Sequence, residues 1–353
     1  MAAILDFTKF SFGAEEIRAV KELLFDEVIV APEISLLHTV YPGIVYDKEI
    51  GFIGEGGLVG VAHQGCDPQP QAWNIATRMV KWEPKRWEIL IHQCAKDLED
   101  TAAVYSMNTG IAMDEFETSD YMAIVVEVLL NSIKEFVIRL FWFNDTDAAN
   151  VSGGGEITNG VSTAYFKIIN GFFKQMIAAV TADAARGVTI EENDAETYEL
   201  QALDPTNVKN KYLPQIYYGA DITLRQNKNK ILICTQSFYD AYEQSLDGTN
   251  IESMYMNITD GIKTLKYKGL ALFPMPIWDK IILAYYNTGA KLINPHRAVL
   301  TTKDALAVGV DSLGIRTWIF VFYKTSIIFI FFYCLYLLID NLENIKSLFN
   351  GFM

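Results

Sequence analysis

The chain has 353 residues, with 43 acidic against 29 basic side chains, so its formal net charge is −14. An apolar fraction of 51% with 20% charged residues excludes a disordered chain, and four scattered cysteines are too few for a small disulfide-held fold. The acidic balance argues against broad non-specific binding to nucleic acid, which needs clustered positive charge.

The N-terminal part of the chain predicts one short helix followed by extended structure. Residues 14–25 carry apolar side chains on one face at helical spacing. Residues 45–62 are rich in glycine and lack a helical period, which indicates a long loop or hairpin. Residues 71–94 alternate apolar and polar side chains, which predicts a strand with an edge or bulge at Pro84. We therefore expect residues 45–94 to form a two-stranded arm.

The strongest helix prediction covers Tyr121–Phe143, preceded by the capping candidates Thr118, Ser119 and Asp120. This stretch is nearly continuously apolar, so we expect a long buried rod with one polar stripe. The stripe consists of Glu127, Asn131, Lys134, Glu135 and Arg139, of which Glu135 and Arg139 are spaced to form an i,i+4 ion pair.

The second half of the chain alternates helix and strand patterns. A helix is predicted over Tyr165–Ala185, ending near Gly187. Further on, the predicted strands cover 230–234, 270–275, 298–302 and 306–310, and the predicted helices cover 237–243 and 278–286. The body of the protein is therefore expected to be mixed α+β.

The candidate motifs for catalysis or ligand binding do not match their consensus patterns in detail. The glycine run over residues 51–60 has neither the spacing nor the Lys-Ser/Thr pair of a phosphate loop. Asp145, Asp147 and Glu156 match three positions of a calcium loop, but Asn150 stands where that loop needs glycine, which favours an acidic turn. A Ser/His/Asp set could assemble in space, but no motif favours one. We therefore expect no catalytic, cofactor-binding or metal-binding residue.

The basic and aromatic stretch over residues 78–87 could stack nucleic-acid bases, but glutamates interleave with its cations. An exposed strand with an edge that faces a partner is favoured instead. We assign Trp82, Arg86 and Trp87 of this stretch, together with Lys48 from the start of the predicted arm, to an assembly interface.

The last 38 residues differ from the body, because they contain no alanine, no proline and one glycine. The apolar run Trp318–Ile339 is long enough to span a bilayer. Three interpretations compete: a membrane anchor, a buried segment of the body, and translation out of the ancestral reading frame. Codons rich in A and T encode Phe, Ile, Leu, Tyr, Asn and Lys, which favours the last interpretation.

The order of elements is an N-terminal arm, an extended two-stranded loop, a long spine helix and a compact α+β domain. Together with four stretches, this order resembles the major capsid proteins of tailed double-stranded DNA phages, which have the Hong Kong 97-type fold. Within this family, the sequence pattern most resembles that of the group from Bacteroidetes phages and prophages. The four stretches are FWFNDTDAAN at 141–150, KILICTQSFYDAYEQSL at 230–246, LALFPMPIWDKII at 270–282 and NPHRAVLTTKDALAVGVD at 294–311.

This resemblance implies a structural protein that assembles with copies of itself into hexamers and pentamers. It implies an icosahedral shell around double-stranded DNA, contacted without sequence specificity, with scaffold or portal proteins as further partners. The protein would be made in the bacterial host cytoplasm and end in the virion capsid. The expected divisions are 1–44 (N-terminal arm), 45–94 (extended loop), 95–187 (spine-helix domain), 188–314 (axial α+β domain) and 315–353 (apolar tail).

The runner-up interpretation is a membrane-anchored surface or envelope protein. It would have a cytosolic α+β domain and a transmembrane helix in the apolar tail, and a membrane would then be a partner.

Overall fold

The computed structural model describes residues 32–42, 49–53, 77–81, 85–94, 118–247, 255–259, 262–323 and 326–337. The described α-helices are α2 (Pro32–Ser35), α4 (Thr118–Trp142), α5 (Phe172–Ala182), α6 (Pro205–Asn207), α7 (Leu213–Gly219), α8 (Ile222–Gln226), α9 (Gln236–Gln244) and α10 (Pro276–Tyr285). The described strands are β1 (Thr39–Pro42), β2 (Glu49–Ile53), β3 (Thr77–Lys81), β4 (Lys85–Cys94), β5 (Lys230–Cys234), β6 (Tyr255–Thr259), β7 (Ile262–Tyr267), β8 (Leu270–Pro274), β9 (Ala298–Thr302), β10 (Ala307–Tyr323) and β11 (Ser326–Leu337).

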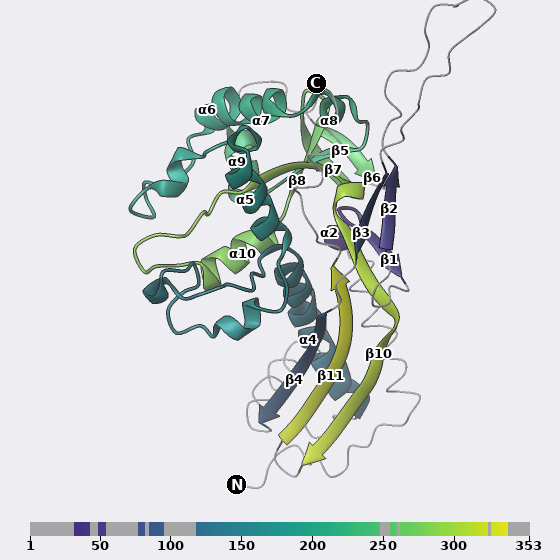
Figure 1. Ribbon diagram of the computed structural model, residues 1–353. Coiled ribbons are helices and arrows are strands. Elements are labelled where there is room, and N and C mark those ends of the chain that lie inside the picture. Colours follow the sequence, from purple (N-terminus) through teal and green to yellow (C-terminus); the bar gives the residue numbers. More distant parts are fainter. Residues whose placement is uncertain are drawn as a thin grey trace, which may run out of the picture.

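Helices and strands of both orientations occur together, so the predicted α+β class is confirmed. The predicted helix over 14–25 lies outside the described residues. Short 3-10 turns connect several elements, and one turn of π-helix over Val208–Tyr212 joins α6 to α7. Figure 1 shows a compact part that contains most of the helices, and α4 with the long strands β4, β10 and β11 extending from it.

A five-stranded sheet in the order β6-β7-β8-β5-β9 forms the centre of the compact part. Its strand β5 runs parallel to β8 and antiparallel to β9. Successive side chains of a strand point to opposite faces, and both faces are covered here: Leu232 and Cys234 belong to one hydrophobic core, and Ile233 belongs to the other. This double burial explains why the run over residues 230–234 is almost continuously apolar.

The first core lies where α4 meets α5 and α10. Its largest members include Phe141 and Trp142 from α4 and Trp278 from α10, which are all shielded from solvent. The second core lies on the other face of the sheet, where the π-helical turn and α9 pack on β5 and β8. Tyr212 and Phe238 are its largest fully buried side chains.

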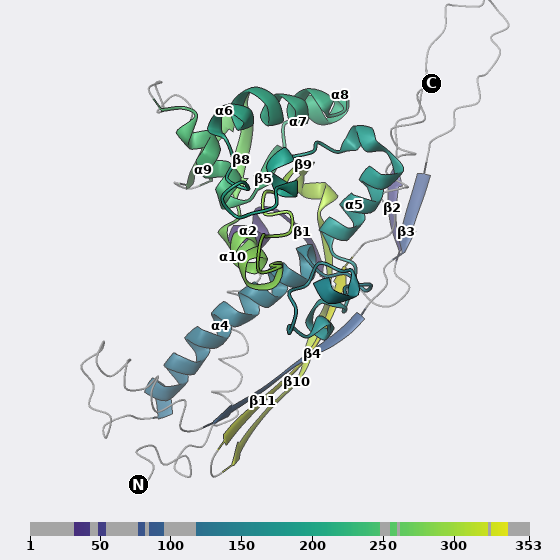
Figure 2. The ribbon, with the colours of Figure 1, turned by 90° about the vertical axis from the view of Figure 1, so that its left-hand side faces the viewer.

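Two smaller sheets extend beyond the compact part, although β1 and the start of β10 pack against the first core. The first has the order β1-β10-β11-β4, with β1 parallel to β10 and the other neighbours antiparallel. The second contains β2 and β3, which form an antiparallel pair. In Figure 2 this pair stands clear of the compact part. The stretch predicted as one arm, 45–94, therefore supplies strands to two different sheets.

The long helix is confirmed, and it begins three residues earlier than the predicted start at Tyr121. The predicted ion pair between Glu135 and Arg139 is wrong. Glu135 bonds instead to Lys280 of α10, with Nζ and Oε2 2.6 Å apart. The Arg139 guanidinium lies over the rings of Phe166 and Tyr285, at 5.3 and 5.7 Å from their centroids. At this end of the helix the polar stripe faces aromatic neighbours, so the cation stacks on rings.

The second helix is shorter than predicted. Tyr165 lies in a 3-10 turn over Thr163–Phe166, and α5 begins only at Phe172. Gly171 precedes it in extended conformation and donates its N–H to the Asn144 carbonyl oxygen. A Cβ atom at position 171 would lie 2.9 Å from backbone atoms of Phe141 and Trp142. The start of α5 is therefore set by its close approach to the end of α4.

Replacing Gly171 with alanine should destabilise the protein by about 1–3 kcal/mol, because the added Cβ forces backbone apart in a packed core. Gly153→Ala is a matched control, since nothing lies within 4 Å of a Cβ there, and it should change stability by less than about 0.5 kcal/mol. Thermal unfolding followed by circular dichroism measures both. Equal melting temperatures for the two variants would contradict the packing of α5 on α4.

The start of the apolar tail lies in strands. The strand predicted over 306–310 continues as β10 to Tyr323, and β11 then pairs with both β10 and β4. Among the residues that the structure describes, no helix is long and apolar enough to cross a membrane.

Candidate functional site

The residues assigned to an assembly interface fall in different parts of the structure. Lys48 and Trp82 lie outside the described residues. Arg86 and Trp87 lie in β4, where their backbones pair with Cys334 and Tyr333 of β11; their side chains are outside the described part. The structure therefore places two of the four on a strand of the extended sheet and leaves their interface role a prediction.

The extended strands offer hydrogen-bonding edges. Within the described part of the chain, β2 and β3 each pair on one side only, and β1 and β4 form the two edges of the four-stranded sheet. Unpaired N–H and C=O groups along such an edge are a template for a strand from another chain. Outside the compact part, the segments 49–53, 77–81 and 85–94 thus present such edges (Figure 1).

The segment that carries β1 is fastened to the long helix by a buried histidine. His38 Nε2 accepts a hydrogen bond from the Trp142 indole N–H at 3.1 Å, and its Nδ1 lies 3.1 Å from the Ile34 carbonyl oxygen. The Nδ1–H tautomer satisfies both contacts. The imidazole also stacks on Phe172, with centroids 5.7 Å apart. Burial lowers the pKa of His38 to about 4, so the ring is neutral at pH 7. Sequence analysis missed this pair, because its members lie 104 residues apart.

A serine and a histidine meet at the start of α9. Ser237 Oγ lies 2.8 Å from His296 Nδ1, and His296 Nε2 lies 2.6 Å from the Gln201 carbonyl oxygen. Asp279 does not complete a triad, because its carboxylate accepts the backbone N–H groups of Gln236 and Ser237. His296 is 7% exposed, which leaves little room for a substrate at its ring. The pair joins the loop before β9 to α9, and its geometry fits a structural link.

Asp279 acts as the cap of α9, although it belongs to another helix. Its Oδ2 lies 2.6 Å from the Gln236 nitrogen, and its Oδ1 lies 3.3 Å from the Ser237 nitrogen. A carboxylate at this position satisfies free N–H groups and faces the positive end of the helix dipole. Burial raises the pKa of Asp279, and the two backbone hydrogen bonds oppose that rise. Serine is a residue type that often caps helices, but the side chain of Ser237 bonds to His296 and Thr235 instead.

The acidic turn after α4 forms ion pairs with a lysine of the same chain. Lys174 Nζ lies 2.8 Å from Asp145 Oδ2 and 3.3 Å from Asp147 Oδ2. The two carboxylates raise the pKa of Lys174, mainly through the hydrogen bond to Asp145. In the part of the chain that the structure describes, no group of His, Cys, Asp and Glu has the arrangement of a metal site. An acidic turn, as the sequence favoured, fits this geometry better than a calcium loop.

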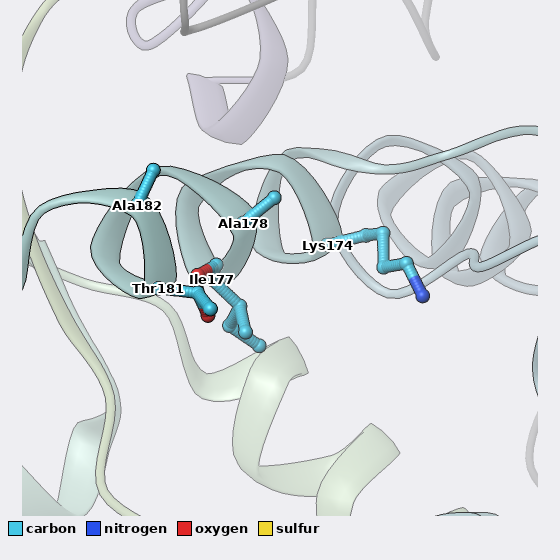
Figure 3. A pocket seen from close by; sticks show the side chains of 5 residues that line it. All are labelled: Lys174, Ile177, Ala178, Thr181 and Ala182. Carbon is cyan, nitrogen blue, oxygen red and sulfur yellow. Dashed lines mark hydrogen bonds between the residues drawn. The ribbon is translucent and has the colours of Figure 1, made fainter.

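A shallow groove of about 410 Å³ runs along one face of α5 (Figure 3). Lys174, Ile177, Ala178, Thr181 and Ala182 line it. Thr181 Oγ1 donates to the Ile177 carbonyl oxygen, so the threonine hydroxyl is engaged within the helix. The groove is therefore mainly apolar, and Ile177 is 52% exposed in it.

A partly buried arginine links the loop before β9 to the first core. The Arg297 guanidinium carbon lies 4.6 Å from the Phe173 centroid, 5.0 Å from that of Phe143 and 5.4 Å from that of Tyr286. Its Nε donates to the Asn294 carbonyl oxygen at 3.0 Å. Burial lowers the pKa of Arg297, and the ring faces stabilise the charged guanidinium. This arrangement positions β9 relative to α4, α5 and α10.

Cys234 cannot serve as a nucleophile in this state. It is fully buried in β5, and burial raises the pKa of its thiol far above neutral. Since the thiolate is the reactive form, the side chain acts as a small apolar group of the second core.

No protein-family model matches the chain, and no curated protein matches it. Several solved structures do match the chain. The satellite phage P4 procapsid, which includes the size determination protein, matches with 12% identity and a TM-score of 0.49, over 94% of this chain and 90% of that chain. The capsid asymmetric unit of cyanophage A-1(L) matches with 14% identity and a TM-score of 0.45, over 88% and 89%.

Mycobacterium phage Ogopogo matches with 13% identity and a TM-score of 0.43, over 86% of this chain and 88% of that chain. All three are phage structures, the class that the sequence resemblance names. At these identities and TM-scores the likeness does not decide function, which has to follow from the geometry of the chain.

Proposed function

We propose that this chain is the major shell subunit of a tailed phage or prophage, with the Hong Kong 97-type fold, and that it assembles with copies of itself. The observation that carries the proposal is the division between a compact part with two hydrophobic cores and extended strands outside it. Sheet edges that lie outside a subunit's own cores are what a lattice of identical neighbours needs.

The order of elements supports the same proposal. The two-stranded pair β2–β3 precedes the 25-residue helix α4, and the unit around the five-stranded sheet follows α4. This is the order that the sequence resemblance implies for extended loop, spine helix and axial domain. The division into 1–44, 45–94, 95–187, 188–314 and 315–353 is part of the proposal. The tail composition supports a changed reading frame, whereas the pairing of β11 with β4 supports a segment of the body.

The proposed self-assembly implies which partners the chain has. Copies of the chain form hexamers and pentamers, double-stranded DNA fills the shell without sequence-specific contact, and scaffold or portal proteins join during assembly. The net charge of −14 suits a wall that must not grip the packaged DNA tightly. The subunit needs no catalytic step, it is made in the host cytoplasm, and it ends in the virion.

Sedimentation of the purified full-length chain over a range of concentrations tests this function. We expect material to move from the subunit into large species as concentration rises, because association follows mass action. A chain that stays monomeric at high concentration and cleaves ester or peptide substrates would reverse the assignment in favour of the Ser237–His296 pair as a catalytic site.

A further inference from the structure

Two ends of the unit around the five-stranded sheet carry exposed apolar side chains. One end is the segment that leads into α6, where Tyr198 is 43% and Leu200 is 64% exposed. The other end includes α7 and α8, where Tyr218 is 57% and Ile222 is 59% exposed. In Figures 1 and 2, α6 and α8 lie at opposite ends of one row of short helices. Large apolar groups that gather at two separate places on a surface indicate contact sites.

The first end, which we call the acidic end, is framed by negative charge. Glu196 and Glu199 flank Tyr198 and are exposed. Neither glutamate forms a salt bridge with a residue that the structure describes. Two cations lie nearby and are engaged: Lys211 Nζ is 2.7 Å from Glu191, and Lys291 Nζ donates to the Asp194 carbonyl oxygen.

The second end, which we call the basic end, is framed by positive charge. Lys268 in the turn between β7 and β8 donates to the Tyr218 hydroxyl, and its Nζ lies 4.2 Å from the Tyr218 ring centroid. Lys228 follows α8 and is exposed. Asp221, beside Ile222, is the acidic residue of this end, and it has interactions of its own. Positive charge therefore prevails around Tyr218 and Ile222.

We propose that the acidic end of one copy docks on the basic end of a neighbouring copy, head to tail. Tyr198 and Leu200 would form one half of an apolar centre, and Tyr218 and Ile222 the other half. The glutamates and lysines would form a charged rim that sets orientation. Because the two ends differ, the contact is heterologous, and repetition about an axis closes it into a ring. The inference rests on the proposed shell function and names the surfaces that join subunits within one ring.

Charge reversal in the full-length chain tests the contact. Glu196→Lys with Glu199→Lys makes both ends basic, and Lys228→Glu with Lys268→Glu makes both ends acidic. Each double variant alone should assemble about tenfold less than the wild type at low salt, because like charges meet across the contact. The two variants mixed in equal amounts should assemble again, since they can alternate around a ring. Negative-stain electron microscopy and sedimentation measure the assembled fraction.

Controls separate this effect from misfolding and from net charge. Asp247→Lys with Asp304→Lys makes the same charge change as the glutamate double variant at two exposed positions that are not among the residues assigned to either end, and it should assemble like the wild type. Circular dichroism should show unchanged folding for all variants, because the altered side chains are exposed.

A wild type that assembles, together with reversal variants that assemble equally well, overturns this contact and leaves the shell function standing. Reversal variants that fail alone and also fail when mixed overturn it too. A wild type that stays monomeric overturns the shell function, and the contact with it.

Discussion

Replacing Trp142 with alanine should cost about 3–5 kcal/mol of unfolding free energy, the range for removing a buried aromatic side chain. Trp142 is fully buried at the end of α4, and its ring centroid lies 4.5 Å from that of Trp278 and 5.1 Å from that of Phe172. The substitution also leaves His38 Nε2 without its donor. Because domains are stable by only about 5–15 kcal/mol, a large share of the margin would be lost.

Two further variants make this prediction specific. Trp142→Phe keeps most of the packing and removes the indole N–H, so it should cost less, about 1–2 kcal/mol. Tyr165→Ala removes a side chain that is 61% exposed and should change little. Urea unfolding of the three variants measures the series. If Trp142→Ala and Tyr165→Ala unfold at the same urea concentration, α4 does not lie in the core described above.

Acidification from pH 6.5 to pH 4 should cost the protein up to about 3 kcal/mol through His38 alone. The folded protein binds a proton at this ring only near pH 4, whereas the unfolded chain binds one near pH 6.5. In this window the unfolded state binds more protons at His38 than the folded state, so stability falls as pH falls. Above pH 6.5 the ring is neutral in both states, and the dependence of stability on its titration vanishes. Burial is the main cause of the lowered pKa of His38, and repulsion between Lys303 and the imidazolium lowers this pKa further.

His38→Gln isolates this contribution. Glutamine does not titrate, and its amide oxygen can accept the Trp142 N–H in place of Nε2. Carboxylates elsewhere titrate in both proteins, so the difference in unfolding free energy between wild type and variant carries the histidine term. The wild type should lose stability faster between pH 6.5 and pH 4. Parallel curves for the two proteins would show that His38 is not buried in neutral form.

Local patterns predicted much of the fold. The apolar run of α4, the β5 run and the helices after Thr235 and Met275 each carry a period or a turn signal within their own residues. The start of α5 could not be predicted, because Gly171 acts through the distant end of α4. The neighbours of Arg139 could not be predicted either, since they come from a turn near residue 166 and from α10.

The candidate sites depend even more on long-range contacts. The pairs His38–Trp142 and Ser237–His296 join residues that lie 104 and 59 positions apart, and no spacing rule links them. The two charged ends have a weaker signal in the sequence. Acidic residues crowd residues 191–204 and basic ones crowd residues 225–230. Only the exposure of Tyr198, Leu200, Tyr218 and Ile222 marks these stretches as contact surfaces.

Cryo-electron microscopy of particles from cells that express the full-length chain tests the shell function most directly. We predict closed shells whose subunits pack with the compact parts around local axes and the extended strands lapped over neighbours. The reconstruction should place the acidic end of each copy against the basic end of the next. Single copies, or open aggregates without repeated contacts, would contradict the account.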